Sequence, residues 1–212
     1  MGIFEVDFVA EHVNLENFPT CVETGTGLAQ STDILQQIFK QVYTIELNEA
    51  LYNEATAKFC ASGNVTCILG DSAYKLGDLI LCLNTATIFF LDAHWSGDDS
   101  VDWNSSHFKG YGRNTSHRNL SKQSCPTSCD QVPLLEEITT IVSFPYACAI
   151  YVDDLDKFGL DGKGLKDKGF LGEDYSHLDW NYLVDLCRFR LEGEFYKENQ
   201  ALLVLSRLNR HH

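Results

Sequence analysis

The stretch that decides the fold is VETGTGLAQS at residues 22–31, where an apolar run passes into a helical pattern. Gly25 and Gly27 stand in the turn between the two, and glycine there permits a tight turn and close approach of a ligand to the backbone. The G-x-G spacing is weak by itself, because Ala29 and Gln30 stand where a dinucleotide-binding fingerprint would place another glycine. The neighbouring segments therefore have to identify the ligand.

Outside this turn, short β-rich apolar runs alternate with helical patterns, as is typical of a βαβ sheet. The predicted strands cover 20–24, 41–46, 65–69, 87–92 and 147–153, and a final pair covers 188–196 and 200–208. The predicted helices cover 4–17, 31–40, 48–62, 72–84, 132–144 and 177–187. We therefore expect a single α/β domain, a size that 212 residues with 44% hydrophobic content support.

Acids after the second and third predicted strands suit a ligand that contains adenosine. Glu46 ends the second strand about twenty residues after the glycines, where a carboxylate can accept both hydroxyls of a ribose. Asp71 and Ser72 follow the third strand, where a second acid can reach an adenine amino group. Binding of NAD would share the glycine turn and the acid after the second strand, but it does not require the acid after the third strand. In the alternative reading, Glu46 and Asp71 are ordinary strand-end caps.

Three more acids follow the fourth and fifth predicted strands. Asp92 ends the fourth strand, and Asp153 and Asp154 end the fifth. Neighbouring parallel strands would bring all three to the same edge of the sheet, where they repel unless they are protonated or neutralised by a cation. Oxygen ligands of this kind suit Mg²⁺, Mn²⁺ or Ca²⁺. The pattern therefore predicts a metal site made of Asp92, Asp153 and Asp154.

The composition argues against several partners. Lys and Arg total 16 against 30 Asp and Glu, a formal net charge of −14, and no basic cluster is present to bind phosphates. No apolar run is long enough to span a membrane, and the N-terminal residues lack the features of a signal peptide. We expect a cytoplasmic protein (in the host cytoplasm, if viral) with reduced cysteines, which binds no nucleic acid and inserts into no membrane.

The motifs around Glu23, Glu46 and Asp71 resemble those of the class I S-adenosylmethionine-dependent methyltransferases, and the resemblance covers nearly the whole chain. It implies a Rossmann-like α/β fold with a mostly parallel seven-stranded sheet of order 3-2-1-4-5-7-6, strand 7 antiparallel, and helices on both faces. It also implies S-adenosyl-L-methionine as the cofactor. The implied cofactor-binding residues are Glu23, Thr24, Gly25, Gly27, Ser31, Glu46, Asp71, Ser72 and Asp92.

Within that class, the segments LDAHWSG at 91–97 and PLLEEI at 133–138 look like the metal-dependent O-methyltransferases. The likeness is to the catechol type and, more closely, to the macrocin and mycinamicin type that methylate sugars. It implies that Asp92, Asp153 and Asp154 hold Mg²⁺ or Mn²⁺, which chelates two adjacent hydroxyls of the acceptor. The expected acceptor is a sugar hydroxyl of a glycan or glycoside, for example on a deoxysugar such as rhamnose.

The expected catalytic residues are Asp92 and His94, with His94 as the base that takes the proton of the acceptor hydroxyl. Relatives more often place the base three residues after the acid, where this chain has Trp95, so His107 and His117 stay open as alternatives. These two histidines belong to a long polar segment. The long segments 96–131 and 157–176 both follow predicted strand ends, and we expect them to be active-site loops.

Other functions remain open from the sequence. The same metal site would serve a catechol-like small molecule, although the polar segment after residue 95 favours a sugar. A non-catalytic module that binds S-adenosylmethionine is a further alternative. Enzymes that methylate nucleic-acid bases carry Pro-Pro-Tyr-like or Pro-Cys motifs after the fourth strand, and this chain has Asp92-Ala93-His94-Trp95 there. Homo-oligomerisation, or a fused glycosyltransferase domain in a longer chain, is compatible with the sequence.

Overall fold

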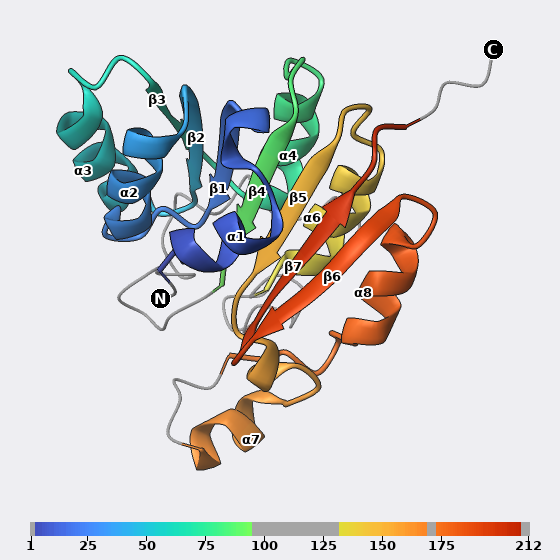
Figure 1. The fold of residues 1–212 in the computed structure, drawn as a ribbon. Coiled ribbons are helices and arrows are strands. Elements are labelled where there is room, and N and C mark those ends of the chain that lie inside the picture. The colour runs from blue at the N-terminus through green and yellow to red at the C-terminus, as the bar shows by residue number, and fades with distance from the viewer. Residues whose placement is uncertain (1–2, 95–131, 169–172, 209–212) are drawn as a thin grey trace.

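A seven-stranded sheet with the order β3-β2-β1-β4-β5-β7-β6 organises the chain, as Figure 1 shows. The computed structural model describes residues 3–94, 132–168 and 173–208. Its strands are β1 Thr20–Thr24, β2 Gln41–Glu46, β3 Val65–Leu69, β4 Thr87–Leu91, β5 Cys148–Val152, β6 Leu191–Lys197 and β7 Gln200–Leu205. The first five run parallel, and β7 is antiparallel to both β5 and β6. The predicted fold class and strand order are confirmed.

Helices cover both faces of this sheet (Figure 1). The described helices are α1 Val6–His12, α2 Gln30–Ile38, α3 Glu49–Phe59, α4 Ser72–Ile80, α6 Leu134–Val142, α7 Gly162–Asp167 and α8 Trp180–Cys187, with 3-10 turns η1 Leu15–Asn17 and η3 Leu155–Lys157. None of the helices in the described ranges has the length and apolar character needed to cross a membrane.

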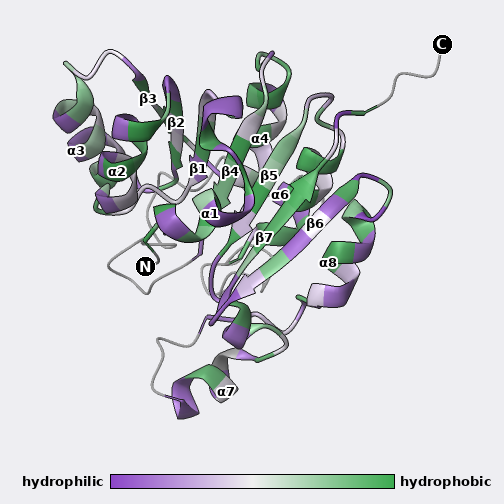
Figure 2. Cartoon of the chain, viewed as in Figure 1, coloured by the Kyte–Doolittle hydropathy of each residue, from purple (hydrophilic) through white to green (hydrophobic). Residues whose placement is uncertain are grey.

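Burial on both faces explains why the central strands read as continuous apolar runs. Along β4, Ile88 and Phe90 face the cluster under α1 and α2, while Phe89 and Leu91 face the cluster under α4, α6 and α8. All four side chains are buried. Figure 2 shows β7 mostly in hydrophobic colours and the edge strand β6 with hydrophilic segments, which matches its partial exposure.

Two segments differ from the sequence prediction. The helix expected over 4–17 ends at His12, because Val13 is extended and Asn14 then caps the short turn η1 with its side chain. The glycine-rich segment 157–176 contains the helix α7, whose start is capped by Asp161 through a 2.7 Å bond from the Gly164 amide. A good capping residue therefore offsets the low helix propensity of the glycines.

The register of the sheet places the predicted site residues at one level. Thr24 at the end of β1 pairs with Ile45 of β2 on one side and with Leu91 of β4 on the other, and Leu91 pairs with Val152 of β5. The residues that follow these strands therefore meet along a single carboxyl edge, which is where open α/β sheets bind ligands.

Candidate active site

The glycine turn after β1 is packed tightly against the end of β4. Gly25 has a φ of +82°, and a Cβ added to it would lie 2.7 Å from the carbonyl oxygen of Asp92. The Gly25 amide donates to the Ile45 carbonyl oxygen over 2.9 Å, which ties the turn to β2 as well. Only glycine fits this position without displacing a neighbouring strand end.

Glu46 holds the same turn from the other side. Its Oε2 accepts a 2.8 Å bond from the Gly27 amide, and its Oε1 accepts a 2.7 Å bond from the Asn48 amide. Burial raises the pKa of this carboxyl, while the backbone donors favour its charged form. Each carboxylate oxygen has a further lone pair, so Glu46 can hold the turn and still accept from a ligand.

Glu23 and Ser31, which were predicted to bind the cofactor, make their described contacts inside the protein. The Oε2 atom of Glu23 accepts from the hydroxyls of Thr32 at 2.6 Å and Thr44 at 2.7 Å. Burial raises the pKa of Glu23 to about 8. The Ser31 hydroxyl accepts from the Phe4 amide over 3.1 Å. The two side chains therefore stabilise the surroundings of the glycine turn through contacts within the protein. Their contact with a cofactor stays a prediction.

Asp71 and Ser72 stand at the start of α4. Asp71 is the N-cap residue of α4, and its Oδ1 accepts a 2.9 Å hydrogen bond from the Ala73 amide. The alternative interpretation, in which Asp71 is a cap, therefore holds for one of its two carboxylate oxygens. Ser72 is buried and lies beside the carboxyl of Glu137 from α6. The pair is thus placed at the edge, next to the turn, as predicted.

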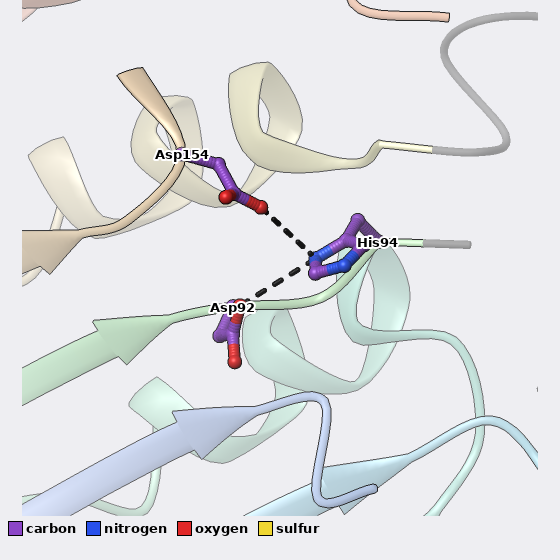
Figure 3. A group of neighbouring side chains, drawn as sticks. All are labelled: Asp92, His94 and Asp154. Carbon is purple, nitrogen blue, oxygen red and sulfur yellow. Dashed lines mark ion pairs between the residues drawn. The ribbon is translucent and has the colours of Figure 1, made fainter. Parts of the chain in front are cut away.

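A cluster of Asp92, His94 and Asp154 lies where β4 and β5 end, with both carboxylates facing the imidazole in Figure 3. The Nδ1 atom of His94 is 3.5 Å from an oxygen of Asp92 and 3.7 Å from an oxygen of Asp154. One donor atom from each residue lies within 4.8 Å of the others, a spacing that could hold a metal ion. The structure therefore brings together two of the three predicted metal ligands with the predicted base.

Asp153, the third predicted ligand, lies beside this cluster rather than in it. Its side chain lines the same cavity, and its Oδ1 accepts a 2.9 Å bond from the amide of Asp154. Asp154 itself has a φ of +66°, which is uncommon for a residue other than glycine and is often found at functional sites. With this backbone conformation, the carboxylates of Asp153 and Asp154 point in different directions.

Two residues that the sequence reasoning did not assign complete the surroundings of Asp154. The Nζ of Lys157 donates to Asp154 over 2.8 Å, and the hydroxyl of Tyr175 donates to the same oxygen over 3.2 Å. Lys157 follows Asp154 by three residues in a 3-10 turn, a spacing that could have indicated the contact. Tyr175 carried no such signal, although it lies in the segment predicted to be an active-site loop.

These contacts shift the pKa values of neighbouring groups in different directions. Burial raises the pKa of Asp153 to about 6, and the nearby charges of Asp154 and Asp92 add to this effect. Burial also opposes the charge of Asp154, but His94 and Lys157 outweigh it and lower the pKa of that carboxyl. For His94, burial favours the neutral ring, yet the hydrogen bond and charge of Asp92 with the charge of Asp154 raise its pKa.

The cluster lines a small cavity at the carboxyl edge. Its polar lining includes Glu137, which the sequence placed in a family-like segment without giving it a role. The described lining residues are Leu91, Asp92, Ala93, His94, Val132, Leu134, Glu137, Asp153, Asp154, Phe158 and Tyr175. Trp95, His107, His117 and the predicted loop 96–131 lie outside the described residues.

Comparison with known proteins identifies the fold. The sequence model of the ribosomal RNA adenine dimethylase family matches residues 5–76, from before α1 into α4. An O-methyltransferase family protein from Burkholderia thailandensis has a TM-score of 0.52 at 10% identity, covering 96% of this chain and 55% of that one. A protein from Pyrococcus horikoshii has a TM-score of 0.50 at 12% identity, covering 95% and 87%. No curated protein sequence matches the chain.

The chain thus has the fold of the class I S-adenosylmethionine-dependent methyltransferases and spans about half, 55%, of the length of the first of these structures. The family match ends inside α4, so it covers the glycine turn, Glu46 and Asp71 but stops before β4. The acidic cluster lies beyond it. The match therefore concerns the predicted cofactor half of the edge and not the half that would receive an acceptor.

Proposed function

We propose that the chain is an S-adenosylmethionine-dependent O-methyltransferase that acts on a sugar hydroxyl with the help of a divalent cation. The observation that carries the proposal is the meeting of two features at one edge of the sheet, the glycine turn held by Glu46 and the cluster of Asp92, His94 and Asp154. An acceptor over the cluster would lie beside a methyl donor over the turn. Holding two reactants in line is a large part of the catalysis of such a transfer.

The residues of the turn suit the nucleoside part of the cofactor. Glu46 has lone pairs left for ribose hydroxyls, and the missing side chains of Gly25 and Gly27 let a ligand approach the backbone. Asp71 and Ser72 would receive the adenine end. When bound, S-adenosylmethionine supplies a methyl group on a positively charged sulfonium, which an oxygen nucleophile attacks.

The donor set of the cluster fits a divalent cation. Asp92 and Asp154 offer carboxylate oxygens, the ligands that Mg²⁺ and Mn²⁺ prefer, and His94 stands close enough to complete a set of three. A bound cation supplies positive charge that offsets the carboxylates and lowers the pKa of an acceptor hydroxyl. Without it, Lys157 and His94 are the described cationic groups that face Asp154.

His94 is the proposed base, and its contacts define what that role requires. Its Nδ1 faces the two carboxylates, which favour the protonated ring, so the ring must be neutral before it can take a proton. A cation on Asp92 and Asp154 would remove that preference. If His94 is a metal ligand instead, a His94→Asn substitution weakens Mn²⁺ binding; if it is the base, the substitution lowers turnover and leaves Mn²⁺ binding intact.

The family match favours a second candidate, methylation of an adenine base in RNA, because the matched model is that of ribosomal RNA adenine dimethylases. The net charge of −14 and the carboxylates at the acceptor end of the edge oppose the approach of a phosphate backbone. A sugar diol or a catechol brings no such charge. Of these two neutral acceptors, we propose the sugar, and a catechol is the alternative.

Incubation with isotope-labelled S-adenosylmethionine tests the proposal, with vicinal-diol glycosides, catechols and RNA oligonucleotides as separate acceptors and mass spectrometry as the readout. We expect methylated glycoside that disappears with a chelator and with Asp154→Asn, but persists with Asp156→Asn, an exposed acid two residues away. Methylation of RNA alone would establish the second candidate. Binding of S-adenosylhomocysteine without transfer to any acceptor would indicate a non-catalytic module.

A further inference from the structure

Glu137, in the first turn of α6, is a buried carboxyl at the carboxyl edge of the sheet. Its side chain is 1% exposed and lines the cavity at the carboxyl edge together with Leu91 and Asp92. Among the described residues, neither of its two oxygens has a hydrogen bond of ordinary geometry. Buried polar atoms in folded proteins are nearly always paired, so a carboxyl with both oxygens unpaired calls for a partner from outside the chain.

Two hydroxyl groups of the same edge lie beside this carboxyl. The hydroxyls of Thr24, at the end of β1, and Ser72, at the start of α4, lie alongside the carboxyl and favour its ionised form. The hydroxyl oxygen of Thr24 is itself buried without a hydrogen bond among the described residues. Each of these hydroxyls can donate one hydrogen bond, so the two carboxylate oxygens, which together offer about four acceptor sites, keep the capacity to accept from a further donor.

The surrounding charges define what kind of ligand group would be favourable here. Asp71 and Glu136 are the charged groups that act on Glu137, and both are acidic. Burial, together with these charges, raises the pKa of Glu137 to about 8. Such a place is unfavourable for an anion and is suited to an amino group, which donates hydrogen bonds and carries partial or full positive charge.

We propose that Glu137 accepts a hydrogen bond from an amino group of the bound cofactor, and that Ser72 places this group as the exocyclic amine of the adenine. This inference rests on the proposed function, because it needs S-adenosylmethionine to occupy the edge. Glu137 would then be a positioning and specificity residue for the purine, in addition to Asp71. The buried carboxyl destabilises the ligand-free protein, and binding of the cofactor would relieve this destabilisation.

Calorimetric binding of S-adenosylhomocysteine, paired with thermal unfolding of the ligand-free protein, tests this. We expect Glu137→Leu to bind about 10- to 100-fold more weakly than the wild type, and Glu137→Gln, which keeps one acceptor oxygen, to lie between them. The ligand-free Glu137→Leu protein should melt about 2 °C or more above the wild type, because the unpaired carboxyl is gone. The exposed Glu54→Gln substitution on α3 is the control and should change neither value.

A second ligand identifies the amino group. S-Inosylhomocysteine has an oxygen in place of the adenine amine. At a pH above about 8, where Glu137 is ionised and has no proton to donate, the wild type and Glu137→Leu should therefore bind it equally weakly. If Glu137→Leu weakens both ligands by the same factor, the adenine assignment is wrong. If it binds S-adenosylhomocysteine as the wild type does, or melts well below it, Glu137 is a structural residue and the inference fails. If the wild type binds no S-adenosylhomocysteine, the proposed function itself fails.

Discussion

Replacing Gly25 by alanine tests the packing that brings the glycine turn to the acidic cluster. The added Cβ would lie 2.7 Å from the Asp92 carbonyl oxygen and 3.0 Å from the Ala93 Cα, both of which belong to backbone that cannot simply rotate away. The φ of +82° adds the usual penalty of a left-handed conformation, about 1–2 kcal/mol. Forcing a methyl group into a filled space costs about 1–3 kcal/mol more. The free energy of unfolding should therefore fall by about 2–5 kcal/mol.

Two other glycines separate these contributions. Gly63 has a φ of +74° with nothing within 4 Å of an added Cβ, so Gly63→Ala carries the backbone penalty alone, about 1–2 kcal/mol. Gly77 lies in α4 with equally free space and no positive φ, so Gly77→Ala should stabilise the protein by about 1 kcal/mol.

Thermal unfolding followed by circular dichroism measures the difference. A loss of 1 kcal/mol lowers the Tm of a domain of this size by about 2–4 °C, so Gly25→Ala should melt about 2–12 °C below Gly63→Ala. It should also weaken S-adenosylhomocysteine binding, which Gly63→Ala should not. If the two variants melt together, the turn after β1 is not packed against Asp92 as described, and the account of the edge is wrong.

Three further predictions follow from the same structure. Arg190 is buried and donates to carbonyl oxygens at the end of α6, before β5 and after β7, so Arg190→Met should cost about 3–5 kcal/mol in urea unfolding; a loss below about 1 kcal/mol would contradict this. Glu23 and Glu137 keep a proton in the folded state that they lose on unfolding, because folding raises their pKa values to about 8. The free energy of unfolding should therefore fall as the pH rises from about 5 to about 8. In Glu137→Gln it should fall less steeply. An unchanged slope would show that Glu137 ionises freely. Lys157→Met removes one of the two described cationic groups that face Asp154, so it should bind Mn²⁺ more tightly than the wild type, as measured by calorimetry; weaker binding would make Lys157 a support of the site rather than a competitor.

The sequence predicted the strands well because the β-rich runs have clear ends. Residues 20–24, 41–46 and 65–69 form β1, β2 and β3 with the predicted bounds, since each apolar run ends at a glycine, an acid or a polar turn. Helix ends were harder to place. The predicted helix 4–17 contains enough apolar residues throughout, and only the conformation of Val13 and the cap at Asn14 end it early.

The site was predictable only as far as strand ends determine it. Asp92 and Asp154 lie at the edge because the residue after a buried strand has to emerge there. Which of two neighbouring acids joins His94 depends on the positive φ of Asp154, which the pattern of residues does not indicate. The contacts of Tyr175 and Glu137 depend on how distant segments fold back onto the edge, and no local spacing reports that.

Calorimetric titration of S-adenosylhomocysteine tests the central claim most directly, namely that the carboxyl edge of this sheet binds the cofactor of a methyltransferase. The wild type should bind one equivalent, and Glu46→Gln should bind about 10- to 100-fold more weakly, because it loses the charge that receives the ribose hydroxyls. The exposed Glu54→Gln substitution should bind as the wild type does. Absence of binding by the wild type, or equal binding by Glu46→Gln, would contradict the claim.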